Sequence, residues 1–314
     1  MTSSRPGRTS SDRLAGTPRV SIGVPVYNGE RYLEETLEAL LSQTLTDFEV
    51  VISDNASTDR TSDIGRAFAA RDERIRYFRN STNVGSAMNF NRIVELSRAE
   101  YFKLANADDL CAPELVAKCV SVLDDHPEVV LAYARTMLID EHGASCGLYD
   151  DRLDIRSPSA PQRFREAMDR VQLVNILQGV MRSSALRYTG LLGPYLSSDL
   201  VLVAELALHG QFWEVPEPLF YRRMHPDALS GLASVEGRWE YVAPASGRKL
   251  RFYHWRLLGE HFAAAWRAPL ATADRLSAFA TLLRRARWSR NVLLSELVRV
   301  PLRSLRGEVT GWRE

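Results

Sequence analysis

The feature that most constrains the fold of this sequence is a regular alternation of short apolar runs with amphipathic segments between residues 20 and 134. Val20–Pro25 and Phe48–Ser53 are apolar and rich in β-branched residues, as buried strands are. The segment between them carries leucines at helical spacing: Leu33, Leu37, Leu40 and Leu41. Strands that alternate with helices in this way predict a parallel sheet with right-handed crossovers.

The same rhythm continues to residue 134 and then weakens. Further strands are predicted at 75–78, 101–104 and 129–134, with helices after residue 59, over 83–96 and over 113–124. Residues 144–163 contain several Asp and Pro residues without a clear period, which predicts a mobile loop. A strand near 179–182, a helix over 200–209 and a strand pair over 212–222, interrupted by Pro216 and Pro218, are predicted to follow.

Composition narrows the class of protein. The 314 residues are 45% hydrophobic, which suits one large domain or one domain plus a helical appendage. A net charge of only +1 does not indicate nucleic-acid binding, so no nucleic-acid partner is expected. Cys111, Cys119 and Cys146 are too few and too irregularly spaced for a disulfide framework, so we interpret them as small core residues in a reducing compartment. With no apolar run of the roughly 18 residues that span a bilayer, a cytoplasmic location is expected.

Two adjacent carboxylates, Asp108 and Asp109, directly follow the predicted strand at 101–104. Ligands bind where the carboxyl ends of parallel strands meet, and two neighbouring carboxylates need a cation, hydrogen bonds or water to offset their repulsion. Mg²⁺ or Mn²⁺ bridging these oxygens and a diphosphate would satisfy that need. The alternative is an acidic loop before a helix that begins near Pro113, because negative charge also favours a helix N-terminus.

Other strand ends also carry polar or aromatic residues. No glycine-rich dinucleotide or P-loop motif follows the first strand; Pro25 and Tyr27 stand there instead, and they would either wall a flat base or form an ordinary turn. Asp54 and Asn55 follow the second strand, where they would either hydrogen-bond a nucleobase or cap the next helix.

Two candidates lie later in the chain. Asp199 begins an apolar helix, so it is either an N-cap or a general base beside an acceptor hydroxyl. His225 follows Arg222 and Arg223, where it would ligate a metal, hydrogen-bond a phosphate or serve only the structure.

Taken in order, these segments resemble the family 2 glycosyltransferases, which have the type A glycosyltransferase fold. The resemblance runs from Val20 to about His225. It rests on the following ordered segments: Val24–Asn28, Asp54–Asp59, Asn83–Gly85 with Asn91, Asp108-Asp109 with Pro113, Ile139–Gly143, Gly179–Arg182, Ser198-Asp199 with Glu205 and Gly210, and Val215–Arg222.

This resemblance implies roles for individual residues. Asp54 would read the base of a nucleotide sugar in a pocket lined by Pro25, Tyr27 and Asn55. Asp108 and Asp109 would hold the ribose, the sugar and a divalent metal, Mn²⁺ or Mg²⁺, with His225 as a further metal ligand, and Asp199 would be the catalytic base. Two departures from the family pattern are Asn106, where an acid is common, and Ala99, where Gly is usual.

Composition, pattern and the resemblance together divide the chain. We expect a disordered leader at 1–18, a nucleotide-sugar-binding half at 19–135, an acceptor-binding half of the same domain at 136–230 and a C-terminal helical extension at 231–314. The fold expected is therefore α/β, a single Rossmann-like domain with a mostly parallel central sheet flanked by helices, plus that extension.

The activity implied is inverting transfer of a hexosyl or deoxyhexosyl group from a nucleotide sugar to a saccharide or lipid-linked acceptor, in bacterial surface-glycan biosynthesis. A catalytically inactive nucleotide-sugar-binding or scaffold protein is one alternative, although Asp199 beside the acid pair argues against it. A sugar nucleotidyltransferase is another, but it would usually carry a glycine-rich, basic loop after the first strand, where this chain has Pro25-Val-Tyr-Asn-Gly29.

The C-terminal tail lies outside the resemblance. Residues 284–314 hold eight Arg and three Glu, interleaved with Leu, Val and Trp. A helix lying on anionic lipid at the inner face of the membrane has this composition, and so does a homodimer contact or a solvated basic face. These alternatives stay open at the level of sequence.

Overall fold

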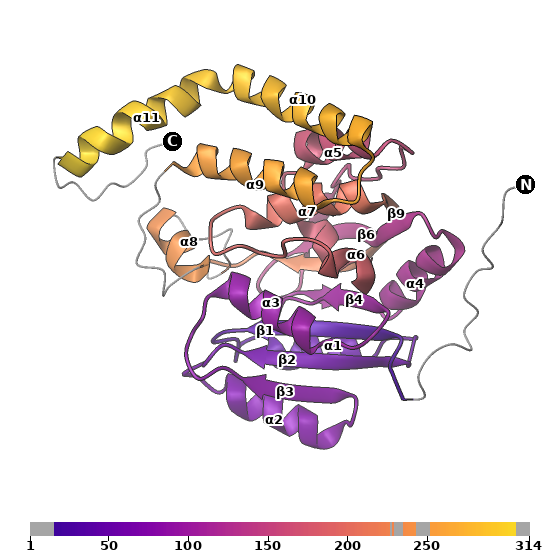
Figure 1. Cartoon of the computed structure of the whole chain (residues 1–314). Helices are drawn as coiled ribbons and strands as arrows, with labels where there is room; N and C mark the ends of the chain where they lie inside the picture. Colours follow the sequence, from indigo (N-terminus) through magenta and orange to yellow (C-terminus); the bar gives the residue numbers. More distant parts are fainter. Residues whose placement is uncertain (1–15, 227, 229–234, 243–251, 306–314) are drawn as a thin grey trace, which may run out of the picture.

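Within residues 16–226, 228, 235–242 and 252–305, which the computed structural model describes, a nine-stranded mixed sheet forms the centre of the protein (Figure 1). Its strands follow the order β3-β2-β1-β4-β8-β6-β9-β5, and β7 pairs with β6 outside this path. The predicted leader, residues 1–18, lies outside the described residues except for its last three.

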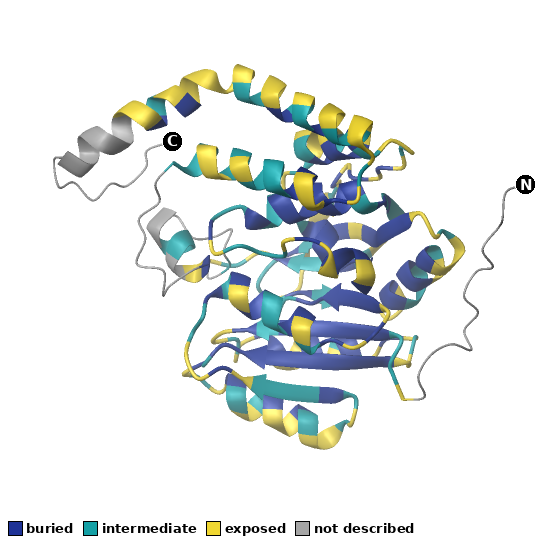
Figure 2. Cartoon of the chain, in the orientation of Figure 1, coloured by how far each residue is buried: buried dark blue, intermediate teal, exposed yellow. Residues whose placement is uncertain are grey.

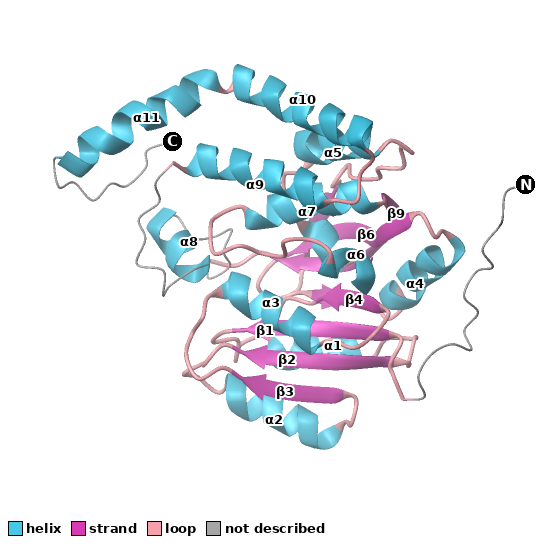
Figure 3. Cartoon of the chain, in the orientation of Figure 1, coloured by secondary structure: helices cyan, strands magenta, loops and turns pink. Residues whose placement is uncertain are grey.

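The first half of the sheet is parallel. Its strands are β1 (Val20–Val26), β2 (Phe48–Asp54), β3 (Ile75–Arg79) and β4 (Tyr101–Leu104), connected by α1 (Leu33–Leu41), α2 (Thr61–Arg71) and α3 (Ser86–Leu96). β1 pairs in parallel with β2 and β4, and β2 with β3. The alternation predicted from the sequence is confirmed, and the carboxyl ends of these strands meet at one edge (Figure 3).

The second half mixes directions. Its elements are β5 (Leu110–Cys111), α4 (Leu115–Asp125), β6 (Val129–Ile139), β7 (Ser145–Tyr149), α5 (Ala160–Arg170), a 3₁₀ turn (Asn175–Gln178), β8 (Val180–Arg182), α6 (Ser183–Arg187), α7 (Ser198–His209) and β9 (Gln211–Arg223). β8 is antiparallel to both β4 and β6, whereas β9 is parallel to β6 and antiparallel to β5. One continuous sheet therefore joins the two halves.

The predicted mobile loop at 144–163 is wrong in part, because the chain forms β7 and the start of α5 there. A tight turn makes the β6–β7 hairpin: the Asp140 carboxylate accepts hydrogen bonds from the backbone N–H groups of His142 and Ala144, and Gly143 has a φ of 86°. This turn chemistry leaves no hydrophobic period in the sequence, and the five residues of β7 are mostly exposed.

The predicted strand pair at 212–222 is also wrong, because β9 is one strand of 13 residues. Its pairing with β6 shifts register between Ala134 and Thr136, which pair with Val215 and Phe220 respectively. The extra residues of β9, including Pro216 and Pro218, lie in this irregularity, where a proline costs no ladder hydrogen bond. The two prolines thus interrupt the ladder without ending the strand.

The C-terminal helical extension is confirmed. It consists of α8 (Val235–Val242), α9 (Tyr253–Arg267), α10 (Thr272–Trp288) and α11 (Arg290–Leu305). A buried cluster with Phe164 of α5, Leu208 of α7, Ala265 of α9 and Leu282 of α10 attaches these helices to the domain. Figure 2 shows that the outward side of α10 and of the described part of α11 is largely exposed, whereas Ala278, Leu282 and Leu293 are buried. Of the cysteines, Cys111 and Cys119 are buried as predicted, but Cys146 is exposed.

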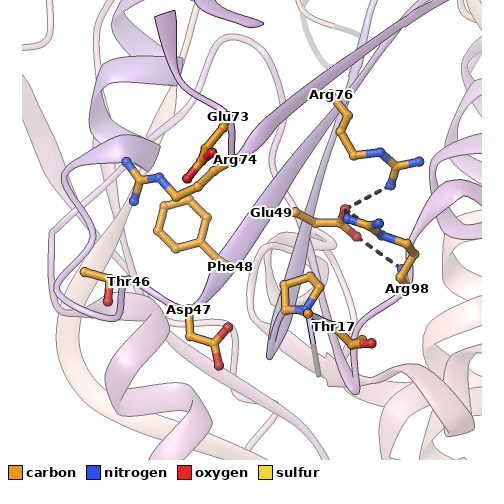
Figure 4. A pocket seen from close by; sticks show the side chains of 11 residues that line it. Thr17, Thr46, Asp47, Phe48, Glu49, Glu73, Arg74, Arg76 and Arg98 are labelled. Atoms are coloured by element: carbon orange, nitrogen blue, oxygen red, sulfur yellow. Dashed lines mark hydrogen bonds and ion pairs between the residues drawn. The ribbon is translucent and has the colours of Figure 1, made fainter. Parts of the chain in front are cut away.

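A buried carboxylate ties the amino-terminal edge of the sheet together. Glu49 of β2 is 3% exposed and accepts hydrogen bonds from Ser21 Oγ (2.6 Å), Arg76 Nη1 (2.9 Å) and Arg98 Nη2 (2.8 Å). Burial alone raises the pKa of Glu49, but these hydrogen bonds outweigh it and lower the pKa below its ordinary value. Figure 4 shows Glu49 between the two arginines on the wall of a hollow of about 680 Å³.

We expect Glu49→Gln to lower the free energy of unfolding by about 2 kcal/mol at pH 7, because two partly exposed arginines lose their shared carboxylate. The pKa of Glu49 is lower in the folded protein than in the unfolded chain. Glu49 therefore stabilises the fold fully at a pH above its unfolded pKa, and this stabilisation is lost as the pH falls through its folded pKa. Urea unfolding of both proteins between pH 7 and pH 3 measures the difference. Glu73→Gln, in an exposed side chain of the same hollow, is the control, and a loss that does not change with pH would contradict this account.

Candidate active site

Asp54 ends β2 with its carboxylate inside a hydrogen-bond network. Its Oδ2 accepts from Tyr77 Oη and Arg79 Nη1, both at 2.6 Å, and its Oδ1 accepts from the Ser57 backbone N–H at 2.8 Å. Burial alone raises the pKa of Asp54, but the hydrogen bonds from Tyr77 and Ser57 and the charge of Arg79 lower it below its ordinary value. Asp54 is therefore ionised and positions Arg79 at the carboxyl edge; direct contact with a nucleobase stays a prediction.

The loop after β1 lies against the polar run after β2. Asn28, at a φ of 51°, donates its backbone N–H to Ser57 Oγ (2.9 Å) and accepts with its side chain from the Thr58 N–H (2.8 Å). Pro25 pairs with Ser53 across the two strands and Tyr27, next along the chain from β1, is 43% exposed. The structure thus brings Pro25, Tyr27 and Asp54 to one edge, with Tyr27 open to solvent.

Asn55 is used within the protein. Its Nδ2 donates to Asn83 Oδ1 (2.8 Å), and its Oδ1 accepts from Asn80 Nδ2 (2.9 Å) and from the Val84 backbone N–H (2.9 Å). These bonds hold the segment between β3 and α3 beside the end of β2. A direct contact between Asn55 and a nucleotide stays a prediction, and the structure gives this residue a positioning role.

Asp108 and Asp109 point in different directions. Asp108, with 30% of its side chain exposed, has Oδ2 2.9 Å from Nε2 of His225. Asp109 is 7% exposed and turns inward, where Oδ1 accepts from the Arg223 backbone N–H and Oδ2 from Asn106 Nδ2, both at 2.9 Å. Burial, followed by the charge of Asp108, raises the pKa of Asp109 to about 7. In this arrangement Asp108 faces the open edge and Asp109 supports the loop.

Strand β9 explains how residues more than a hundred positions apart meet. Leu110 pairs with Tyr221 in the short β5–β9 ladder, so the end of β9 runs beside the acid pair. Arg223, 3% exposed, donates through Nε to the Asp108 backbone carbonyl (2.9 Å) and through Nη2 to Glu35 (2.7 Å). Two residues later His225 reaches Asp108, with its ring 5.1 Å from that of Tyr32.

Asn106 stands where the resemblance leads one to expect an acid, and its contacts give a physical reason. Its amide donates to the buried Asp109 carboxylate. An aspartate at this position would instead place a further negative charge against a carboxylate whose pKa is already raised by burial and by Asp108. The asparagine thus stabilises the inward orientation of Asp109.

Asp199 lies in the first turn of α7, and its Oδ1 accepts from the Leu200 backbone N–H at 2.9 Å. Burial raises the pKa of Asp199 above its ordinary value. The positive charge of Arg222 partly opposes the effect of burial on the pKa of both Asp109 and Asp199. Arg222 is held by a 2.6 Å hydrogen bond from Nη1 to Oδ1 of Asn175.

Several of these residues escaped the sequence analysis. Arg79 and Tyr77 lie on β3. The parallel pairing of β2 with β3, which sets Asp54 opposite Arg79, is the feature that could have indicated them. In the sequence, Arg222 and Arg223 stood out only as the residues that precede His225. No local motif distinguishes the buried Arg223 from the partly exposed Arg222, because the difference arises from tertiary packing.

The spacing of Asp108 and His225 is compatible with two ligands of a divalent ion, and their role as ligands stays a prediction. Two adjacent ligands of an octahedral ion at about 2.1 Å lie about 3 Å apart, and the Asp108–His225 distance is 2.9 Å. Among the residues that the structure describes, no group of three or more His, Cys, Asp or Glu side chains forms a ready metal site. Further ligands would therefore come from a bound diphosphate and water, as is usual for Mg²⁺ at phosphate sites.

Comparison with known proteins agrees with this geometry. The sequence model of glycosyl transferase family 2 matches residues 21–152, which contain the first-half strands and the acid pair. An uncharacterised glycosyltransferase of Methanocaldococcus jannaschii is 29% identical over 128 residues, which cover 40% of this chain and 44% of that protein. The chain spans less than half the length of the first curated relatives it matches.

Two solved structures share the fold. S. aureus TarS in complex with UDP has a TM-score of 0.60 at 17% identity and covers 87% of this chain and 73% of its own. The mannosyltransferase PcManGT from Pyrobaculum calidifontis, solved with GDP-Man and Mn²⁺, has a TM-score of 0.50 at 20% identity and covers 94% and 77%. This domain has the type A glycosyltransferase fold, and residues 21–152 of the chain match glycosyl transferase family 2.

Proposed function

We propose that this chain is an inverting glycosyltransferase that moves one sugar from a nucleotide sugar to a hydroxyl of a saccharide or lipid-linked acceptor. The observation that carries the proposal is the Asp108–His225 pair at the carboxyl edge of the sheet, with Asp199 within the field of the same arginine, Arg222. Residues 19–135 would bind the donor and 136–230 the acceptor. Transfer in bacterial surface-glycan assembly is the biological setting we infer.

The residues have distinct roles in this reaction. Asp199 accepts the proton of the acceptor hydroxyl, whose oxygen forms a bond to the anomeric carbon as the bond from that carbon to the diphosphate breaks. The diphosphate leaves with the electron pair. Displacement on the face opposite the leaving group inverts the anomeric configuration.

Asp108 and His225 would hold Mn²⁺ or Mg²⁺, and Asp109 would support the loop from within. When bound, the ion neutralises charge on the departing diphosphate. Pro25, Tyr27 and the Asp54–Arg79 pair would line the nucleotide pocket. TarS was solved with UDP and PcManGT with GDP-Man, so UDP-sugars and GDP-sugars are the first donors to test.

A panel of nucleotide sugars with Mn²⁺ or Mg²⁺ tests the proposal through two readouts, thermal stabilisation and release of nucleoside diphosphate. The proposal expects both with at least one donor, and EDTA should reduce both. Stabilisation without release under any condition would indicate an inactive nucleotide-sugar-binding protein. Release of pyrophosphate from a nucleoside triphosphate and a sugar phosphate would indicate a nucleotidyltransferase.

We also propose that α10 and α11 contact an anionic membrane surface. Their outward face exposes apolar side chains: Leu276, Leu283, Trp288, Leu294, Leu297 and Val298. Exposed arginines at 284, 287 and 290 accompany them, whereas Glu296, the one acidic residue between positions 276 and 298, is buried against His254. Apolar side chains beside cations are typical of helices that lie on anionic lipid. No helix in the described parts of the chain is long and apolar enough to cross a bilayer.

Sedimentation with vesicles of phosphatidylcholine, with and without phosphatidylglycerol, tests this contact. We expect the double variant Leu283→Glu and Leu294→Glu to lose at least about tenfold in affinity for anionic vesicles, because two apolar side chains no longer enter the lipid and two like charges are added. Leu148→Glu, equally exposed but on β7, is the matched control and should bind normally. Equal binding of all three proteins would contradict the proposal, and loss of self-association instead would assign the face to a second copy of the chain.

A further inference from the structure

The C-terminal extension reaches the candidate active site. Val242 of α8 packs with Ala87 of α3 and with Leu192 and Leu196 of the loop that precedes α7. Figure 1 shows α8 and the beginning of α9 on the side to which the arrowheads of β2 and β3 point. The extension is therefore placed to contribute side chains beside the catalytic edge.

Tyr253, the first residue of α9, contributes such a side chain. Its hydroxyl lies 2.7 Å from Oγ of Ser197, the residue that precedes α7. Ser197 has a φ of 62°, and this left-handed turn is followed two residues later by Asp199. Burial raises the pKa of Tyr253, and the negative charge of Asp199 adds to this shift, as expected if the phenol lies within its field. Two hydroxyls thus stand together beside the proposed base.

Neighbouring contacts hold Tyr253 in place. His254 Nδ1 lies 2.7 Å from Oε1 of Glu296, and Trp255 Nε1 donates to the Leu293 carbonyl at 2.9 Å, so the start of α9 is fixed to α11. Arg256, one turn further along α9, lies over the ring of Tyr195, 4.4 Å from its centroid. A side chain held in this way can bind a ligand at a low cost in conformational entropy.

We infer that Tyr253 and Ser197 form part of the acceptor site and orient the attacking oxygen toward Asp199, an inference that rests on the proposed function. Each hydroxyl can donate and accept a hydrogen bond, which matches the hydroxyls of a saccharide. A few polar groups placed in this way fix the orientation of a ligand. Tyr253 is thus a positioning residue supplied by a segment outside the matched family region of residues 21–152.

The test uses hydrolysis of the donor identified in the panel, with water as the attacking group, in Tyr253→Phe, Ser197→Ala and the double variant. We expect kcat to fall about fivefold in each single variant, the effect of one hydrogen bond, with donor KM, nucleotide affinity and melting temperature unchanged. Because the two hydroxyls act together, kcat of the double variant should be little lower than kcat of either single variant. Tyr188→Phe, in a side chain that is 74% exposed, should match the wild type.

The other possible results would each contradict either the role of Tyr253 and Ser197 or the proposed function. An unchanged kcat in Tyr253→Phe and Ser197→Ala would overturn the acceptor role. Parallel losses of kcat, nucleotide affinity and melting temperature would show a structural role instead, and would also overturn it. Absence of hydrolysis by the wild type with every donor would remove the proposed function itself, which distinguishes that failure from failure of the Tyr253 assignment.

Discussion

Asp199→Asn is expected to lower the rate of sugar transfer by about 10²- to 10⁴-fold, the usual contribution of a general base, while nucleotide affinity changes less than about twofold. The amide keeps the shape of the side chain but cannot take the proton of the acceptor hydroxyl. Rates of nucleoside diphosphate release and calorimetric nucleotide affinities measure the two quantities. Asp150→Asn, in an exposed acid away from α7, is the control and should be fully active.

The pH profile provides an independent check on the same residue. Because the base must be ionised and burial raises the pKa of Asp199, the rate should rise with pH along a limb that lies above the ordinary aspartate value of about 3.9. This limb should be absent from the residual rate of Asp199→Asn. Undiminished turnover in that variant would remove Asp199 from the mechanism.

Asp108→Asn is expected to lower the nucleotide affinity measured with Mn²⁺ by at least about tenfold, and to leave the affinity measured in EDTA unchanged. The reason is that Asp108 presents Oδ2 beside His225 Nε2, where an ion would be shared with the diphosphate. Calorimetric titrations with a nucleoside diphosphate, with and without metal, measure both values.

Asp109→Asn is the matched control, because the carboxylate of Asp109 is already bonded to Asn106 and to the Arg223 backbone. It should keep most of the metal-dependent gain in affinity. If Asp109→Asn loses that gain and Asp108→Asn keeps it, the two residues have been assigned in the wrong order.

Local pattern was sufficient to predict the first half of the fold. Apolar runs such as Val20–Val26 and leucines at helical spacing are short-range signals, and parallel strands necessarily bring their carboxyl ends to one edge. The approximate location of Asp54 and of the acid pair follows from that rule. The structure places these residues together at this edge, as expected because strand ends can be read from sequence, and their functional roles stay predictions.

Side-chain direction was not predictable in this way. Asp108 and Asp109 are adjacent in sequence, yet one faces His225 and the other faces Asn106, because strand β9 supplies a backbone donor to only one of them. Likewise β9 continues past Pro216 and Pro218, since its irregular register with β6 tolerates them. Contacts between distant segments decide both features, and a single sequence carries no direct record of such contacts.

The extension illustrates the same limit. Composition indicated that residues after 246 are helical and basic, and this was confirmed for α9 to α11. The closeness of Tyr253 to Ser197, however, depends on the return of the chain to the catalytic edge after β9. The extension was therefore expected to be an appendage, whereas the structure places Tyr253 against Ser197, two residues before Asp199.

The most direct test of the central claim is the anomeric configuration of the first product. Proton NMR during donor hydrolysis, before the free sugar equilibrates in solution, shows which anomer forms first and needs no knowledge of the natural acceptor. One displacement assisted by Asp199 predicts the anomer opposite to that of the donor. First appearance of the donor's own anomer would contradict the mechanism.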